Sequence, residues 1–307
     1  MVYYFVDNGA PPLCVCNAGE RRIRIFTGGV SVSCDLHCHT KLSDGSVGIE
    51  ELISLAKRRG LTAIAVTDHD TFAGAVRGVN IGKRLGITVI PGAELSAWDS
   101  EAGRKVHILC YNCESTARLE GLCHRTLESR KKSATEMLKK VMRYYRLVPE
   151  MVVRCANGST AVYKQHIMHA LVEAGFADSI FGDTFERLFG KEKGVARVQN
   201  TYPDVREVLE LVRSAGGIAV LAHPYLYDSI DLMQKLVAEG LLDGIEVAHH
   251  SHSEEQEAEL RAFAKLNGLL MTGGSDFHGM YSSGARAVGS TTIEDEALAA
   301  LNSFKRG

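Results

Sequence analysis

Hydrophobic runs of strand length recur along the chain from residue 32 onward and alternate with amphipathic stretches of helical period. The runs predict strands at 32–37, 62–68, 88–94, 106–111, 218–223, 244–249 and 269–276. The amphipathic stretches predict helices at 49–59, 73–85, 205–215, 232–239 and 254–267. Strands that alternate with helices are typical of a parallel sheet, and this number of units is enough to close a β/α barrel.

The alternation stops between residue 113 and about residue 201. A long helix rich in Lys and Arg is predicted at 119–145, followed by helices near 162–173 and 184–189, and no strand pattern occurs. We therefore predict an N-terminal extension with a short strand or ribbon at 1–31, two barrel parts at 32–113 and 202–307, and an inserted helical cap at 114–201. Because the insertion follows a strand and precedes a helix, both junctions are expected at the carboxyl-terminal face of the barrel, where such barrels keep their active sites.

Acidic and imidazole side chains lie at the ends of most of the predicted strands. In DLHCHTKLSDG, His37 and His39 share one side of a strand because side chains alternate, and Asp44 follows in the loop. The other segments are VTDHD with His69, GAE with Glu94, LAHP with His223, and GSDFH with Asp276 and His278. His107 comes before its apolar run, so its position in the strand is less telling.

Each of these residues alone could be an ordinary core or surface side chain. In a closed barrel, however, all would meet at one face, and so many buried polar groups require a cation. Imidazoles and carboxylates without a thiolate suit Mn, Fe or Zn, and nine ligands suit two or three ions, with Glu94 or Asp276 as bridges. Paired ions activate water and hold phosphoryl oxygens. No GxSxG or P-loop motif indicates another chemistry.

Composition narrows the partners and the compartment. The chain has 307 residues, 45% of them hydrophobic and 23% charged, and a formal net charge of -2, which does not favour stable binding to duplex DNA or a membrane. We find neither a membrane-spanning stretch nor a signal peptide. The eight cysteines all precede residue 156, which favours a reducing cytoplasm. The pairs Cys110–Cys113 and Cys14–Cys16 are interpreted as buried or incidental thiols.

These motifs, in this order, resemble the PHP (polymerase and histidinol phosphatase) family over about residues 32–113 and 200–280. The resemblance implies a distorted (β/α)7 barrel of the TIM-like kind with up to three divalent ions. It also implies a set of nine metal ligands, namely His37, His39, Asp44, His69, Glu94, His107, His223, Asp276 and His278.

The predicted insertion and the segments AGGIAVLAHP and DGIEVAHHSHSEEQ resemble the family branch that acts on nucleoside 3′,5′-bisphosphates, nucleotides or the 5′ ends of short RNA. That branch commonly opens a helix with Arg-Pro-His, where this chain has Tyr163-Lys164-Gln165-His166. The departure leaves the substrate open.

Cationic side chains of the predicted cap are candidates for substrate binding. Lys164 and His166 lie in it, and Arg130 and Lys131 lie in its long helix. A polyanionic substrate needs donors beyond the metals. For Arg130 and Lys131 a solvated helix face is an equal alternative.

His249, His250 and His252 follow the apolar segment GIEVA. We expect His252 to contact phosphate or to donate a proton to the leaving group. For His249 and His250 an exposed polar loop is the alternative. We expect Asp35 and Asp68 to orient ligand imidazoles.

The sequence therefore predicts a metal-dependent phosphoesterase that hydrolyses a phosphomonoester of a nucleotide. The first alternative is a phosphatase for histidinol phosphate or another small phosphomonoester. A non-catalytic metal-binding regulatory module and a polymerase-associated proofreading module are alternatives of other classes. No protein partner is indicated.

Overall fold

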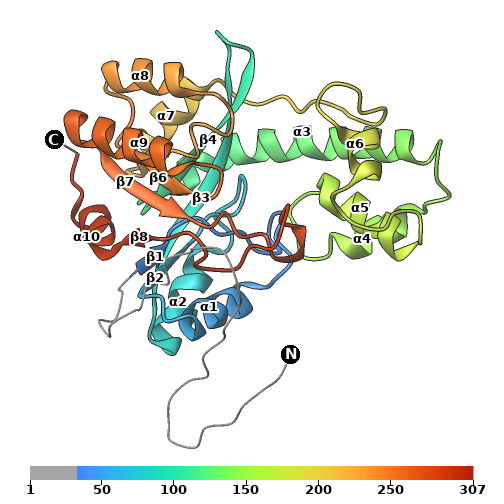
Figure 1. Cartoon of the computed structure of the whole chain (residues 1–307), viewed down its shortest axis with the longest axis horizontal. Coiled ribbons are helices and arrows are strands. Elements are labelled where there is room, and N and C mark those ends of the chain that lie inside the picture. Colours follow the sequence, from blue (N-terminus) through green and yellow to red (C-terminus); the bar gives the residue numbers. More distant parts are fainter. Residues whose placement is uncertain (1–32, 307) are drawn as a thin grey trace, which may run out of the picture. The chain divides into compact units, whose positions relative to one another are not determined.

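A computed structural model describes residues 33–306 of the chain (Figure 1). The predicted extension at 1–31, including the Cys14–Cys16 pair, lies outside the described residues.

The eight described strands form one sheet that curls into a nearly closed barrel. Their order is β7-β6-β5-β4-β3-β2-β1-β8. The backbone N–H of Leu36, just after β1, donates to the carbonyl of Gly273 in β7 at 3.0 Å, so the barrel closes between β7 and β1. All seven predicted strands are present, and β8 was not predicted. The bounds are β1 (Ser33–Asp35), β2 (Ala63–Val66), β3 (Thr88–Asp99), β4 (Arg104–Tyr111), β5 (Ile218–Leu221), β6 (Gly244–His249), β7 (Leu270–Gly274) and β8 (Ile293–Glu294).

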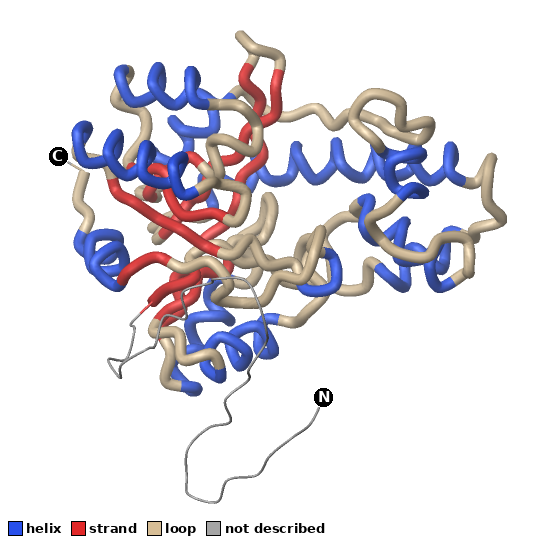
Figure 2. Tube along the Cα trace, viewed as in Figure 1, coloured by secondary structure: helices blue, strands red, loops and turns tan. Residues whose placement is uncertain are grey.

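Helices surround the strands (Figures 1 and 2). The α/β barrel class predicted from the sequence is confirmed, whereas α4, α10 and the short 3-10 turn η1 were not predicted. The bounds are α1 (Ile49–Arg58), α2 (Ala75–Leu85), α3 (Ala117–Val141), α4 (Pro149–Cys155), α5 (Lys164–Glu173), α6 (Asp183–Phe189), α7 (Val205–Ser214), α8 (Ile230–Ala238), α9 (Glu254–Asn267), η1 (Gly279–Tyr281) and α10 (Asp295–Ser303).

The prediction of an all-parallel sheet is wrong at β4, which runs antiparallel to both β3 and β5. A short hairpin joins β3 to β4, so no crossover helix intervenes. Tyr111, the last residue of β4, pairs with Ile218, the first residue of β5. The insertion therefore leaves the barrel at the amino-terminal face of the parallel strands, not at the predicted face.

The long helix α3 carries the chain back toward the opposite face. Its 25 residues span about 37 Å at the usual helical rise. The chain rejoins the barrel at Pro203, whose carbonyl accepts a hydrogen bond of 2.8 Å from the N–H of Trp98 near the end of β3. Only the second junction lies where the sequence predicted it.

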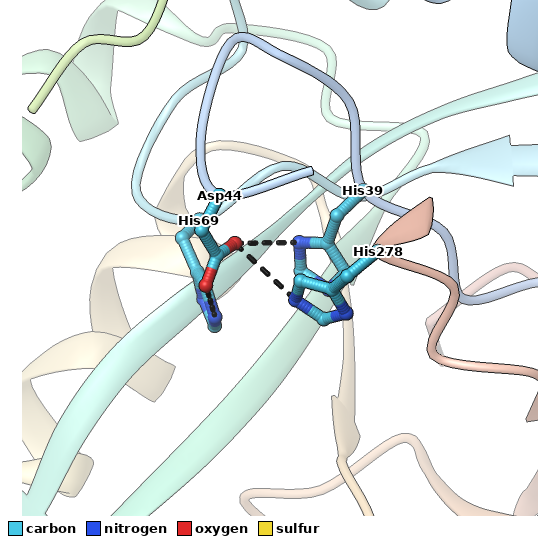
Figure 3. Close-up of side chains that lie close together, drawn as sticks. All are labelled: His39, Asp44, His69 and His278. Atoms are coloured by element: carbon cyan, nitrogen blue, oxygen red, sulfur yellow. Dashed lines mark ion pairs between the residues drawn. The ribbon is translucent and has the colours of Figure 1, made fainter. Parts of the chain in front are cut away.

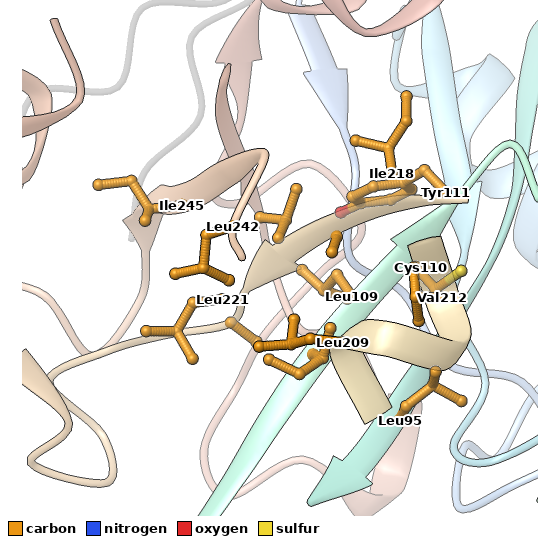
Figure 4. Packing of buried hydrophobic residues seen from close by; sticks show 14 of the residues in the cluster. Leu95, Leu109, Cys110, Tyr111, Leu209, Val212, Ile218, Leu221, Leu242 and Ile245 are labelled. Carbon is orange, nitrogen blue, oxygen red and sulfur yellow. The ribbon is translucent and has the colours of Figure 1, made fainter. Parts of the chain in front are cut away.

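The barrel core is built from the inner and outer faces of the strands and the helices that cover them (Figure 4). Leu95, Leu109 and Ile245 are fully buried there, and α7 contributes Leu209 and Val212. The hydroxyl of the buried Tyr111 donates to the carbonyl of Leu36 at 2.7 Å, so the largest buried side chain also satisfies its polar atom.

A second core holds the inserted helices together. It joins the last turns of α3 to α4, α5 and α6, which lie beside that half of α3 (Figure 1). Tyr281, from the loop after β7, is buried in the same cluster and links it to the barrel. No described helix is long and apolar enough to cross a membrane.

Gly274 of β7 packs tightly against the segment 35–37 at the end of β1. A Cβ atom at this position would lie 2.5 Å from the His37 Cβ and 2.8 Å from an Asp35 carboxylate oxygen. We expect Gly274→Ala to lower the free energy of unfolding by ~1–3 kcal/mol, because an overpacked site must shift its neighbours. Chemical denaturation measures this. Gly48→Ala, at a glycine whose Cβ would meet nothing within 4 Å, is the control; equal stability losses would contradict the packing argument.

Candidate active site

All nine residues predicted as metal ligands meet at one end of the barrel. Eight are less than 10% exposed, and the Asp276 side chain is 14% exposed. His107 joins them because β4 is antiparallel: an early position in β4 lies beside the last residues of β5, where the Ala222 N–H donates to the His107 carbonyl at 3.1 Å. The antiparallel direction of β4 therefore explains why a ligand candidate lies early in its strand.

Glu94 contacts five imidazoles and lies at the centre of the cluster. One carboxylate oxygen, Oε2, is 3.1 Å from His69 Nδ1, 3.2 Å from His39 Nε2 and 3.4 Å from His37 Nε2. The other oxygen, Oε1, is 3.0 Å from His223 Nε2 and also contacts His107 Nδ1. A carboxylate in this position can bridge ions bound on its two sides.

Asp44 and Asp276 occupy the outer side of the cluster. Asp44 Oδ1 lies 3.2 Å from His278 Nε2 and 3.7 Å from His39 Nδ1, and its Oδ2 lies 3.9 Å from His69 Nε2 (Figure 3). Asp276 Oδ1 lies 3.3 Å from His39 Nε2. Among the nine predicted ligands, three overlapping groups of donors result: His39, Asp44, His69 and His278; His37, His39, Glu94 and Asp276; and His69, Glu94 and His107.

The donor atoms fit divalent cations. Buried ring nitrogens of five of these histidines, together with Asp44 Oδ1, have no hydrogen-bond partner among the described residues. A buried polar atom without a partner costs free energy, and ligation by a cation removes that cost. The unpartnered nitrogens belong to His37, His39, His69, His107 and His223.

The pKa shifts of the clustered side chains also favour a bound positive charge. Burial alone would raise the pKa of Glu94, but His107, His69 and His37 hold it well below its usual range, so Glu94 stays ionised. Burial lowers the pKa of His69 to about 4, which leaves a neutral imidazole. Burial opposes the charge on His39 as well, yet Asp276 and Glu94 raise its pKa to about 10. A bound cation would take the place of that proton.

Glu246, in the middle of β6, was not predicted from the sequence. Its Oε1 accepts from His37 Nδ1 at 2.9 Å and its Oε2 accepts from the His223 N–H at 2.8 Å, and the side chain is fully buried. It therefore fixes the tautomer of one candidate ligand and the backbone of another. An acid inside the apolar strand GIEVAH is the signal that could have identified it.

The prediction that Asp35 and Asp68 orient imidazoles is wrong, because both hold loops. Asp68 accepts from Thr40 N–H, Thr40 Oγ1 and Ser43 Oγ at 2.6–2.8 Å and so fixes the segment between His39 and Asp44. Asp35 accepts from Ser275 N–H, Ser275 Oγ and Gly289 N–H at 2.6–2.9 Å, next to Asp276.

Backbone strain is concentrated at the same place. His223 and Asp276 have positive φ angles of 29° and 50°, and Asp70, next to His69, has 53°. Residues with a Cβ rarely adopt this region, and strain of this kind clusters at functional sites.

A cleft of about 790 Å³ extends from the cluster to the inserted helices, and Asp44 and His69 line its inner end. Of the predicted substrate residues, Lys164 and Arg130 line it. Arg130 is held there by Asp70 at 2.8 Å and Ser96 at 2.7 Å, and its guanidinium lies 4.9 Å from the centre of the Tyr163 ring.

The other two candidates of the insertion do not line the cleft. His166 is buried, and its Nδ1 accepts from the Tyr163 N–H at 3.1 Å, so it caps the start of α5. Lys131 is exposed and pairs with Glu128 at 2.7 Å, which is the solvated face left open as an alternative.

Of the three histidines at the end of β6 and just after it, His249 points at the cluster. Its side chain is fully buried, and its Nε2 lies 3.6 Å from Asp276 Oδ2 without a hydrogen-bond partner among residues 33–306. The Ser251 N–H donates to its Nδ1 at 3.2 Å, so Nε2 carries the proton. His252 donates from Nδ1 to the Val247 carbonyl at 3.0 Å, and its ring lies 5.4 Å from that of His249; His250 is exposed.

A barrel with a buried cluster of imidazoles and carboxylates at its mouth defines a metal-dependent hydrolase. Residues 35–217 match the PHP domain family, and the chain belongs to that family. It is a metal-dependent phosphoesterase.

Three relatives have names that refer to different phosphate-ester substrates. The chain is 39% identical over 249 residues to a phosphoribosyl 1,2-cyclic phosphate 1,2-diphosphodiesterase of Eggerthella lenta, covering 80% of this chain and 94% of that protein. It is 32% identical to a 5′-3′ exoribonuclease of Haemophilus influenzae, covering 80% and 89%. It is 28% identical to a 3′,5′-nucleoside bisphosphate phosphatase of Chromobacterium violaceum, covering 84% and 90%.

A crystal structure described as a metal-dependent phosphoesterase of Bifidobacterium adolescentis is similar to the whole described fold. The TM-score is 0.79 at 27% identity, and the match covers 87% of this chain and 94% of that one. The predicted family and enzyme class are thereby confirmed, whereas the names of the three relatives refer to different substrates.

Proposed function

We propose that the chain hydrolyses a phosphate ester of a small ribose phosphate that bears a second phosphate group. The observation that carries this is the charge of the cleft. Lys105, Lys164 and Arg197 line it, and none of them has a carboxylate within 4.0 Å among the described residues. Cations without a carboxylate partner, in a cleft that leads to a candidate metal cluster, suit a second anionic group of the substrate.

Aromatic side chains between these cations suit the sugar or base of such a substrate. Tyr163, Tyr202, Tyr227 and Phe189 line the cleft, and the Tyr163 ring is stacked on His69 with 6.2 Å between ring centres. Aromatic faces bind bases and sugars by stacking and apolar contact. The substrates in the names of the three relatives share a ribose and its phosphates.

We further propose that the nine clustered residues hold two or three divalent ions of Mn, Fe or Zn. Such ions, when bound, supply a hydroxide at neutral pH and neutralise phosphoryl oxygens. Glu94, Asp44 and His278 would be among the residues that hold these ions. The mixture of imidazole and carboxylate oxygen is the donor set on which this assignment of metals rests.

The chain's other residues position the substrate. The neutral Nε2–H of His249 is a donor for a phosphoryl oxygen or for Asp276 Oδ2. Arg130, fixed by Asp70 and Ser96, lines the cleft beside the Tyr163 ring. The sequence predicted that His252 contacts phosphate or donates a proton. We assign this role to His249 instead, because His249 faces the cluster.

The test is phosphoester hydrolysis by the Mn²⁺-loaded protein with phosphoribosyl 1,2-cyclic phosphate, adenosine 3′,5′-bisphosphate, a 5′-phosphorylated RNA dinucleotide, AMP and histidinol phosphate. We expect the compounds with a second phosphate or phosphodiester group to have the highest kcat/KM. Preference for AMP or histidinol phosphate would contradict the two-phosphate proposal and leave the metal-dependent chemistry in place.

Lys164→Ala is expected to raise the KM for the preferred substrate about tenfold with little change in metal content. Burial, with Arg197 and Lys105 nearby, lowers the pKa of Lys164 to about 8. The ammonium is present below that pH and lost above it, so the wild-type KM should rise as pH increases through 8. Steady-state kinetics from pH 6.5 to 9.5 measure both effects. Lys131→Ala is the control, and an unchanged KM in Lys164→Ala would remove Lys164 from the site.

A further inference from the structure

A second cluster of metal-binding side chains lies in the inserted helices, apart from the nine residues of the barrel. Cys155 ends α4, and His169 and Glu173 are one turn apart on α5. Their ligand atoms all lie within 4.8 Å of one another. The three side chains are partly exposed, so an ion can reach them from solvent.

Hydrogen bonds around the cluster fix the histidine in an orientation suited to a ligand. His169 Nδ1 lies 2.9 Å from the Tyr281 hydroxyl, which itself donates to the Cys155 carbonyl at 3.5 Å. A proton on Nδ1 would point at this hydroxyl and leave the lone pair of Nε2 facing Glu173 Oε1 at 3.5 Å. Two acceptors that face each other repel unless a cation lies between them.

The carboxylate is also held in place. Arg154 Nη2 donates to Glu173 Oε2 at 2.7 Å, which leaves Oε1 turned toward His169 and Cys155. The separation of 3.5 Å between Nε2 and Oε1 is close to the ~3.4 Å that tetrahedral bonds of about 2.1 Å to one zinc ion require. Outer contacts of this kind, to an imidazole N–H and to a ligating carboxylate, accompany metal sites.

We propose that Cys155 Sγ, His169 Nε2 and Glu173 Oε1 bind one zinc-class divalent cation, with water as the fourth ligand. A thiolate selects zinc-class ions over Mg and Mn, so this site differs in preference from the thiolate-free barrel cluster. The thiol proton leaves when the ion binds. Burial and then Glu173 raise the pKa of Cys155 to about 11, so affinity increases with pH.

The position of Tyr281 gives the site a consequence for the barrel. Tyr281 ends η1, which directly follows His278, and its ring is packed in the core of the inserted helices. An ion on Cys155 and His169 would therefore fasten α4 and α5 to the loop that carries Asp276 and His278. The proposal does not depend on the substrate or on the chemistry of the barrel cluster.

Cobalt absorption tests the proposal in the full chain. Thiolate bound to Co²⁺ gives a charge-transfer band in the near ultraviolet, and the barrel cluster has no thiolate to contribute. We expect the band on titration with Co²⁺, its loss on addition of Zn²⁺ and its loss in Cys155→Ser. His169→Gln, which keeps every cysteine, and Tyr281→Phe, which removes one hydroxyl, should each weaken Co²⁺ binding at least tenfold.

The controls separate this site from other thiols and from the barrel. Cys113→Ser removes another partly exposed cysteine, and Glu94→Gln disrupts the barrel cluster; both should keep the band. A band that is absent from the wild type, or that persists in Cys155→Ser, would overturn the proposal. Loss of turnover in Glu94→Gln with the band intact would show that the proposed zinc-class site binds its ion independently of the barrel cluster.

Discussion

Glu94→Gln should abolish phosphoester hydrolysis and remove most of the bound metal. Both oxygens of Glu94 face imidazoles, at 3.0–3.4 Å where they approach His37, His39, His69 and His223. Glutamine keeps the size of the side chain but replaces one oxygen with an NH₂ group, which cannot ligate a cation. We expect kcat/KM to fall about 10³-fold or more, which is ~4 kcal/mol of transition-state stabilisation.

Metal analysis by plasma mass spectrometry, together with kinetics at saturating Mn²⁺, measures both parts of this prediction. Glu50→Gln is the matched control, because Glu50 is exposed and pairs with Arg84 at the surface. Circular dichroism and the melting temperature check that Glu94→Gln is folded. A folded variant with wild-type turnover and metal content would exclude the barrel cluster as the active site.

The strand ends could be predicted from the sequence because buried parallel strands are short, apolar and followed by polar residues. His37, His69 and Asp276 each come within three residues of the end of such a run, so their convergence needs only the assumption of a barrel. The direction of β4 could not be predicted, because an apolar run reads the same for parallel and antiparallel pairing. For this reason the position of His107 in its predicted strand differed from that of the other candidate ligands, although all of them lie in one cluster.

The supporting contacts were harder to predict, because they depend on loops that meet only in three dimensions. Asp35 binds Ser275 and Gly289, which are more than 200 residues away in the sequence. An acid next to a candidate ligand histidine suggests an imidazole contact, but local sequence does not say which loop will compete for it. Glu246 makes the contact with His37 that had been expected of Asp35.

The substrate side was predicted least well, because amphipathic helices do not reveal which face meets the barrel. Lys164 lines the cleft, whereas His166, two residues on, is buried as the cap of α5. Similarly, His249 is turned inward and His250 outward at the end of β6. Whether each residue faces the cleft depends on packing between the insertion and the barrel.

Glu246→Gln should weaken metal binding about 100-fold without removing any candidate ligand. One oxygen of Glu246 accepts from His37 Nδ1–H, and the other accepts from the His223 N–H. A glutamine amide can offer an acceptor to only one of these donors, so the other donor faces an NH₂ group. If His37 loses its acceptor, its proton moves to Nε2, where the lone pair for the ion is needed.

Activity as a function of Mn²⁺ concentration distinguishes this effect from a loss of catalytic chemistry. We expect the apparent Mn²⁺ affinity to fall, and kcat to recover to within about tenfold of the wild type once the metal is saturating. Asp243→Asn is the matched control: Asp243 is also buried and accepts from the Ala219 N–H at 2.8 Å, but it does so at the start of β5, away from the cluster. That variant should lose stability and keep its metal affinity. Equal Mn²⁺ affinities in Glu246→Gln and the wild type would mean that Glu246 supports the fold of β6 and does not tune the imidazole of His37.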